Sequence, residues 1–321
     1  MKLINSINRV YELLLFNNRI ITVGHQSNKR VDLPVTQTGS GMILAFSNQL
    51  YRQCGDLNPI EIYNDKFSLV DEIEKGFFLY RAKVIDDFIF ILSRLTQSFW
   101  KFLSSGEKIC TNYEPIDFIA QIKNILIGIK DRQLVVYEPA SGSIKLNLRL
   151  RISGDETDAA KQSDGICGNS EYLVFPLNNG QLLCLHASDG SRAWLKSYGD
   201  EGGSHVYFDG KVYRNNGHWL REIDIATGEV LKELNYKQSL PGVDASNMMG
   251  QFQVYEDVVV LKSANCVVPL YNRKNFNLID FAQPNGWETM ALSSDASVIR
   301  WNEGKLYVLN LNEDLFVYAL D

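Results

Sequence analysis

Short apolar runs recur along the whole chain, and polar turns separate them. Three of them read Leu-Val-Val-Tyr at 134–137, Leu-Leu-Cys-Leu at 182–185 and Val-Val-Val-Leu at 258–261. A strand in a sheet that is covered on only one face alternates between apolar and polar residues. These runs do not alternate, and no long segment has the 3.6-residue period of an amphipathic helix. The pattern therefore predicts an all-β chain whose strands are buried on both faces.

The runs repeat in a fixed order, most clearly in the segments 172–198 and 206–234. Each copy contains an apolar run, a tight turn, a second apolar run, a Gly turn and a third strand-like run. We assign the apolar run before the Gly turn, the second run of each copy, to the third strand of a repeating unit. Seven such units then follow one another at a mean step of about 45 residues. These third strands are predicted at 42–47, 99–103, 134–138, 182–187, 220–224, 266–271 and 315–320.

Two kinds of turn separate the runs. The turn before each third strand is rich in Asn and Gly, which tolerate the positive φ that tight hairpins require. The turn after it has Gly behind a short side chain in four of the units. These glycines are Gly106, Gly142, Gly190 and Gly228. The sixth unit has Asn272-Arg-Lys-Asn at this place and the first has Ser47-Asn48, so the repeat is clear in the third to fifth units and degraded elsewhere.

A repeat of this length with strands buried on both faces predicts a seven-bladed β-propeller of four-stranded antiparallel blades, formed by residues 1–321 as a single domain. The chain ends directly after 315–320, so the last blade lacks its fourth strand. We expect part of the N-terminal segment 2–14 to supply that strand. This pairing would close the ring and remove its open edge.

The turn in the fourth unit resembles the repeat of quinoprotein-type, PQQ-like propellers. Its sequence is His-Ala-Ser-Asp-Gly-Ser-Arg-Ala-Trp, in which Trp194 follows Gly190 by four residues. Lys232 and Leu146 stand at the Trp position of two other units. The resemblance implies the fold. Cofactor-dependent members of that family would also be expected to have a signal peptide, adjacent cysteines and a carboxylate-rich calcium site. These features are not found in the sequence, so we expect no cofactor.

Charge and composition narrow the classes of function. The formal net charge is −6, with 45% hydrophobic and 22% charged residues, so the balance disfavours nucleic-acid binding and favours a basic protein partner. No apolar stretch is long enough to span a membrane, and no signal peptide is recognised. The five cysteines are widely spaced and form neither a disulfide framework nor a zinc motif. We expect a cytoplasmic protein that does not act at a membrane.

The candidate binding residues lie on the long connections between units, because function in propellers is carried mainly by loops. One connection is acidic, two others offer apolar groups suited to a protein contact, and a fourth carries a histidine beside two acids. Trp287 is a candidate contact residue or a plug of the central channel. The partner-binding set is Asp155, Glu156, Asp158, Asp164, Asp200, Glu201, His205, Met248, Met249 and Trp287.

The sequence contains no catalytic or nucleotide-binding motif. Our main hypothesis is therefore a protein-binding propeller without enzyme activity, for example an immunity protein that covers a basic toxin domain. A propeller enzyme or metal-binding protein, using His205 with Asp200 and Glu201, is the alternative from another class. A scaffold subunit of a larger complex is a third. We expect His186 to be a packed core residue and His218 to be solvated in a turn.

Overall fold

The protein is described here from a computed structural model. The described residues are 1–7, 10–16, 19–24, 42–53, 58–66, 68–85, 88–93, 99–103, 108–109, 117–123, 125–138, 143–151, 165–177, 179–199, 203–216, 218–240, 252–261, 267–282, 298–309 and 315–320. The chain divides into two compact units, which are described separately. Unit 1 comprises Met1–Asn8, Asp131–Leu134 and Leu146–Asp321, and unit 2 comprises Arg9–Lys130 and Val135–Lys145. The expectation of a single domain stays a prediction.

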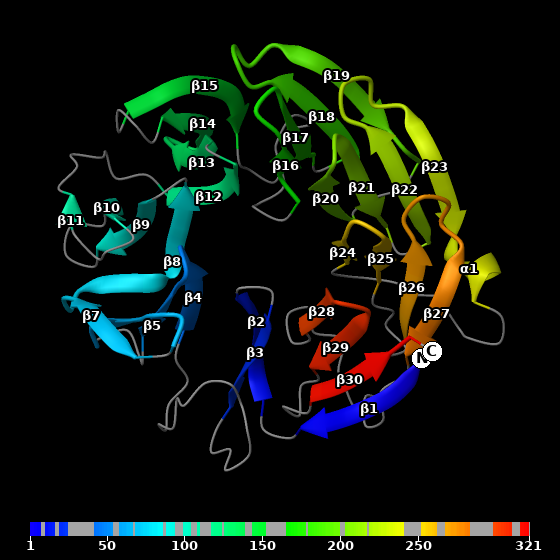
Figure 1. The fold of residues 1–321 in the computed structure, drawn as a ribbon. Helices are drawn as coiled ribbons and strands as arrows, with labels where there is room; N and C mark the ends of the chain where they lie inside the picture. Colours follow the sequence, from blue (N-terminus) through cyan, green and yellow to red (C-terminus); the bar gives the residue numbers. More distant parts are fainter. Residues whose placement is uncertain are drawn as a thin grey trace. The chain divides into compact units, whose positions relative to one another are not determined.

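Six of the seven predicted units are four-stranded antiparallel sheets, and in each of them the predicted third strand is the third strand (Figure 1). Five of these sheets consist of four consecutive strands. The first is β8 (Phe77–Ile85), β9 (Phe88–Ser93), β10 (Phe99–Leu103) and β11 (Lys108–Ile109). The second is β12 (Asp117–Ile122), β13 (Ile125–Lys130), β14 (Gln133–Glu138) and β15 (Ser143–Arg151).

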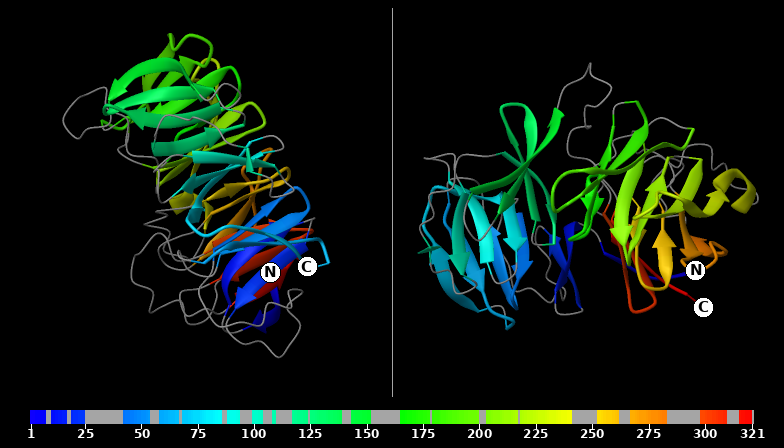
Figure 2. Two further views of the ribbon diagram at one scale, coloured as in Figure 1. Left: turned by 90° about the vertical axis from the view of Figure 1, so that its left-hand side faces the viewer. Right: turned by 90° about the horizontal axis from the view of Figure 1, so that it is seen from above.

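The next three sheets follow the same plan within unit 1. One is β16 (Cys167–Gly168), β17 (Tyr172–Pro176), β18 (Gln181–His186) and β19 (Arg192–Ser197). Another is β20 (Ser204–Phe208), β21 (Lys211–Asn215), β22 (Trp219–Asp224) and β23 (Val230–Asn235), followed by the short helix α1 (Tyr236–Ser239). The third is β24 (Gln253–Val254), β25 (Val258–Val260), β26 (Val268–Asn272) and β27 (Leu278–Ala282). Figure 2 shows these sheets, coloured green to orange, from two further sides.

The sixth sheet joins the two ends of the chain. Strands β28 (Val298–Asn302), β29 (Lys305–Leu309) and β30 (Leu315–Ala319) are consecutive, and β1 (Lys2–Ile7) pairs with β30 as the fourth strand (Figure 1). The amino group of Met1 also forms an ion pair with Asp280 in β27. The prediction that the N-terminal segment completes the last sheet is confirmed.

The first predicted unit, and with it the division of the chain into seven repeats, is wrong. Residues 20–23 belong to β3 (Arg19–Gly24), which pairs with β2 (Val10–Phe16) in a separate two-stranded sheet. The predicted third strand at 42–47 is instead the first strand of a sheet of its own. That sheet consists of β4 (Met42–Phe46), β5 (Gln49–Gln53), β6 (Ile60–Tyr63) and β7 (Leu69–Ile73).

The true third strand of that sheet, β6, was missed because it is short and alternating. Its sequence is Ile-Glu-Ile-Tyr, and its residues alternate between buried and half-buried. The search for repeats relied on runs that are apolar on both faces, which such a strand does not resemble.

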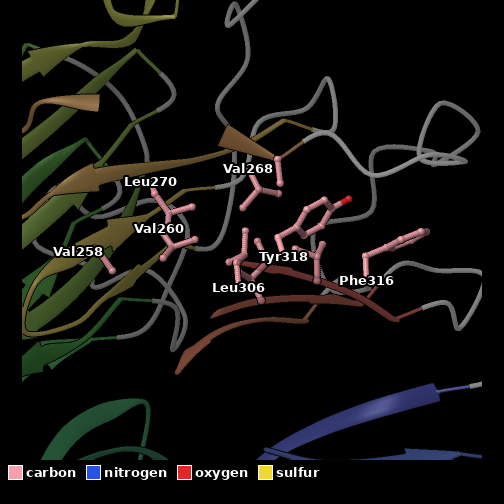
Figure 3. Packing of buried hydrophobic residues seen from close by; sticks show 10 residues of the cluster. Val258, Val260, Val268, Leu270, Leu306, Phe316 and Tyr318 are labelled. Atoms are coloured by element: carbon pink, nitrogen blue, oxygen red, sulfur yellow. The ribbon is translucent and has the colours of Figure 1, made fainter. Parts of the chain in front are cut away.

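Strands in the middle of unit 1 are buried on both faces, as predicted. In β25, Val259 packs toward the sheet β20–β23, whereas Val258 and Val260 pack toward β28–β30. Figure 3 shows the second of these cores, in which Val258, Val260, Val268 and Leu270 face Leu306, Phe316 and Tyr318. Each of these sheets therefore shares one core with the sheet before it and another with the sheet after it, which explains the continuous apolar runs.

The two other clusters show the same arrangement. Side chains of β16–β19 pack on those of β20–β23, including Val174, Cys184, Trp194, Val212 and Ile223. In unit 2, side chains of β4–β7 pack on those of β8–β11, including Tyr51, Ile60, Ile62, Ile89, Ile91 and Phe102. Neighbouring sheets are thus joined mainly by apolar contacts, which are the dominant favourable term in folding.

One turn geometry recurs after three third strands. The amide groups of Gly190, Gly228 and Phe276 each donate to the carbonyl oxygen four residues earlier, at 2.8 Å in every case. All three residues have positive φ, of 72°, 69° and 59°. The sixth unit keeps this turn without Gly, because Phe276 adopts the left-handed conformation that Gly usually provides.

The same three turn residues contact the fourth strand of the preceding sheet. A Cβ at Gly190 would lie 3.2 Å from Leu146, and one at Gly228 would lie 2.8 Å from Trp194. The ring of Phe276 lies under the ammonium group of Lys232, which is 5.6 Å from its centroid. Trp194 is further held by Nε1, which donates to the Ile225 carbonyl at 2.8 Å. Leu146, Trp194 and Lys232, which stand at the Trp position of the PQQ-like repeat, thus each contact the turn of the following sheet.

Candidate functional site

Of the ten predicted binding residues, His205 alone belongs to the described residues. It lies in β20, directly opposite Arg214 of β21, and its side chain is only 8% exposed. The imidazole packs against Gly165, where a Cβ would come within 2.8 Å of Nδ1. His205 therefore offers little surface to a partner. The other nine lie outside the described residues: Asp155, Glu156, Asp158, Asp164, Asp200, Glu201, Met248, Met249 and Trp287.

His205 lies at one end of a row of polar and charged side chains that crosses the sheet β20–β23. In register with it are Arg214, then Arg221 in β22, then Glu233 in β23. Arg221 Nε donates to the Glu233 carboxylate at 2.5 Å, and its guanidinium lies 5.5 Å from the Trp219 ring centroid. The row spans the four strands on one face of the sheet, and its Arg221–Glu233 contact joins β22 to β23.

Arg214 is the most deeply buried charged side chain of this row, at 1% exposure. Both of its terminal nitrogens donate to the Gly180 carbonyl of the preceding sheet, and its guanidinium lies 5.4 Å from the Tyr198 ring centroid. Burial raises the pKa of Tyr198, and the charge of Arg214 partly opposes this shift. Arg214 thus links two sheets of unit 1. The sequence reasoning missed it, and the only signal was an arginine inside an apolar strand.

The buried cysteines and the two other histidines among the described residues show no reactive arrangement. Cys167 and Cys184 are buried free thiols, and desolvation raises the pKa of both to about 12, so neither is a ready nucleophile. His218 is exposed, as predicted, whereas His186 is only half-buried and lies beside Tyr172. Within the described ranges no group of His, Cys, Asp and Glu could hold a metal ion, and no helix there is long and apolar enough to span a membrane.

Exposed apolar side chains gather on one kind of strand, the fourth strand of a sheet. Among the described residues, every large apolar side chain classed as exposed lies in β1, β7, β19, β23 or β27. They are Leu3, Leu69, Val70, Leu195, Val230, Leu231, Ile279 and Phe281. The inner strands, by contrast, are largely buried. Accessible apolar surface in this chain is thus concentrated at the fourth strands, where side chains and backbone edge are both available to a partner.

These fourth strands also share a β-bulge close to their first residue. The register places one extra residue in each strand: Ile4, Val70, Ala193, Leu231 or Ile279. A bulge twists an edge strand and weakens regular pairing with another chain. The bulge is therefore a recurring feature of the fourth strands that the apolar pattern of the sequence did not predict.

Directly after the bulge, two fourth strands carry an Asp that covers the next amide. Asp71 accepts from the Glu72 N–H and Asp280 from the Phe281 N–H, each at 2.8 Å. Both backbone amides thus have an acceptor on the side chain of the preceding residue. In the other three bulged strands the equivalent position holds Asn5 in β1, Trp194 in β19 and Lys232 in β23, and the side chains of Trp194 and Lys232 lack an acceptor.

Comparisons with known proteins identify the fold. No protein-family model matches the chain, and no curated protein matches its sequence. Among solved structures, BamB from Moraxella catarrhalis is 12% identical with a TM-score of 0.60, covering 99% of this chain and 99% of that one. The fold is a β-propeller. The C-terminal WD40 domain of Sif2 is also 12% identical, with a TM-score of 0.61 over 100% of this chain and 98% of its own.

A third similar structure is the computationally designed Ika8 protein, 11% identical with a TM-score of 0.50, covering 87% of this chain and 95% of that one. At this level of identity the similarities show the fold alone, an all-β propeller with four-stranded antiparallel blades. They do not assign the PQQ-like repeat, which stays a prediction.

Proposed function

We propose that this chain is a protein-binding propeller without catalytic activity. The observation that carries the proposal is the concentration of exposed apolar side chains on fourth strands, such as Leu231, Ile279 and Phe281. Single exposed apolar residues are common on proteins. In five of the sheets they are restricted to the fourth strand, and this arrangement presents contact area on a rigid scaffold that loses little entropy on binding.

The finer form of the proposal is that the partner is a basic protein. The net charge of −6 supports this, as does the acidic connection with Asp155, Glu156 and Asp158. An immunity or inhibitor protein that covers a toxin domain in the cytoplasm is the specific form that we favour. The contact of Trp194 with Gly228 supports a PQQ-like repeat as the origin of the scaffold.

The alternative of a metal-binding or catalytic propeller required His205 to act with Asp200 and Glu201. The burial of His205 against Gly165 does not favour it. Metal analysis of the purified protein tests this alternative directly. Stoichiometric bound metal would contradict the non-catalytic proposal.

The proposal is tested by isolating the full chain from its source cells after chemical crosslinking. We expect one partner in stoichiometric amount, with a basic isoelectric point. A variant in which Asp155, Glu156 and Asp158 are replaced by Lys should lose most of that partner, whereas replacing the exposed Asp65, Glu229 and Glu303 by Lys should not. Recovery of no partner from repeated native and crosslinked preparations would overturn the proposal. Fractionation of the same cells tests the cytoplasmic location.

A further inference from the structure

The open edge of β7 differs from the other fourth strands in both exposure and charge. Its first four residues are all exposed, whereas β19 and β27 contain exposed, half-buried and buried residues. Leu69 and Val70 are 51% and 49% exposed, the highest values among the exposed large apolar side chains. In the described part of the chain β7 pairs with β6 alone, so its second edge is open.

An unbalanced row of charges ends at this edge. Arg52, Glu61 and Glu72 lie directly opposite one another on β5, β6 and β7. The Arg52 guanidinium is 3.6 Å from the Glu61 carboxylate, which also accepts from the Tyr63 hydroxyl at 2.7 Å. Glu72 therefore lies opposite the Glu61 carboxylate, which already has Arg52 as its ion-pair partner. Like charges directly opposite each other destabilise a sheet.

The fold gains nothing from this like-charge pair, and one further cation beside Glu72 would balance the row. Asp71 and Glu74 add to the negative charge of the same edge, against the single Lys75. The Glu72 N–H donates to the exposed carboxylate of the preceding residue, Asp71. A strand added here could take over that amide with its own carbonyl and place a basic side chain next to Glu72.

We propose that β7 binds an extended segment of the partner protein as an added strand, with a basic residue beside Glu72 and apolar residues against Leu69 and Val70. This inference rests on the proposed function and specifies its surface. Acids on a strand edge also serve to keep other chains away. That role predicts no binding at β7, so one experiment separates the two.

The experiment uses the full chain and a ten-residue peptide that alternates lysine and valine. We expect hydrogen exchange to slow over residues 69–73 when the peptide binds, and to stay unchanged over 230–235. A peptide alternating glutamate and valine should not protect 69–73. A lysine–valine peptide with alternate backbone nitrogens methylated keeps its charge but cannot form the ladder, so it should bind about tenfold more weakly.

Two matched variants complete the test. Glu72→Lys should weaken peptide binding about tenfold, whereas Glu229→Lys, an equal change of charge in an exposed turn of another sheet, should change it by less than about twofold. Both side chains are exposed, so both variants should fold, and circular dichroism checks this. Absent protection over 69–73, equal binding of the methylated peptide, or equal weakening by both variants would each overturn the strand-addition proposal.

The two proposals can fail separately. If the cellular partner still binds the Glu72→Lys variant with unchanged affinity, the β7 surface is wrong and the protein-binding function stands. If no cellular partner exists, the proposed function fails whatever the peptide does.

Discussion

Single residues in the recurring turn decide how closely neighbouring sheets pack. Gly228 combines a φ of 69° with the indole of Trp194 lying where a Cβ would stand. At the same place in another sheet, Phe276 accepts the left-handed conformation and fills the space with its own ring, which is 4% exposed. The repeat therefore maintains a contact between sheets and not a particular residue type.

Gly228→Ala should lower the free energy of unfolding by about 2–4 kcal/mol, because the new methyl group meets Trp194 in addition to the unfavourable φ. Gly210→Ala is the matched control. Gly210 has a φ of 75° but open space around its Cβ position, so only the backbone term of about 1 kcal/mol applies. Urea unfolding of both variants measures the difference. Equal losses would show that the contact with Trp194 contributes little.

The Asp224 side chain gives its turn a pH dependence. Its carboxylate accepts from the amides of Thr227 and Ala226, and these bonds, the Thr227 amide first, lower its pKa below the ordinary value of 3.8. A carboxylate with a lowered pKa in the folded state adds stability above its unfolded pKa, and this is lost as the pH falls through the folded value.

Asp224→Asn should keep the turn, because Asn272 accepts the Lys274 amide at the corresponding place of another sheet. We therefore expect a small loss of stability at pH 7 and a flatter acid limb, so that the difference between the two proteins narrows as the pH falls below about 4. Unfolding midpoints measured between pH 2 and 7 check this. A constant difference over that range would contradict the assignment of the pH dependence to Asp224.

At the scale of elements, the fourth strand is where each sheet meets solvent. Bulges recur near the start of β1, β7, β19, β23 and β27, and the exposed apolar side chains lie on these same strands. A bulge limits unwanted pairing, whereas exposed apolar residues favour contact. The two features together allow selective association and disfavour unspecific edge-to-edge aggregation.

Removal of residues 1–8 should destabilise unit 1 and promote aggregation, because it opens the edge of β30 and removes the ion pair of Met1 with Asp280. We expect the free energy of unfolding to fall by about 3–5 kcal/mol, with about one net hydrogen bond lost per residue of β1. Thermal unfolding and light scattering measure both effects. The substitution Leu3→Ser, at a 44% exposed position of β1, should leave both nearly unchanged.

For the whole molecule, the net charge sets how a partner approaches. A chain of net charge −6 attracts a basic partner over long distances, and dissolved salt screens this attraction. In the proposed complex, the apolar contacts on the fourth strands are not screened by salt and act only after the partner has bound. The proposal therefore assigns the association rate to the charges and the dissociation rate to the apolar side chains.

The association rate with the captured partner should therefore fall by about tenfold or more between 50 and 500 mM NaCl, while the dissociation rate changes by less than about threefold. Stopped-flow or surface-based kinetics at several salt concentrations checks this. An association rate independent of salt would contradict the proposal of a basic partner, although not that of a protein partner.

The accuracy of the sequence-based prediction differs from strand to strand. Runs such as 182–185 marked third strands correctly, since side chains that face two cores must be apolar at every position. The alternating Ile60–Tyr63 was missed, because a strand half-exposed on one face carries a weaker signal. The predicted binding residues came from loop length and charge, and of these the structure describes His205 only, a buried residue.

The sequence by itself determined the all-β class, the four-stranded repeat, most of its third strands and the pairing of the N-terminal segment with the last sheet. The first three follow from local periodicity and turn chemistry, which act within a few residues, and the pairing followed from the missing fourth strand of the last repeat. Only the tertiary structure decided that Arg214 is buried between sheets, that Phe276 replaces Gly, and that Glu72 stands opposite Glu61 at an open edge. Each depends on which strands become neighbours, a relation between distant residues that no local pattern contains.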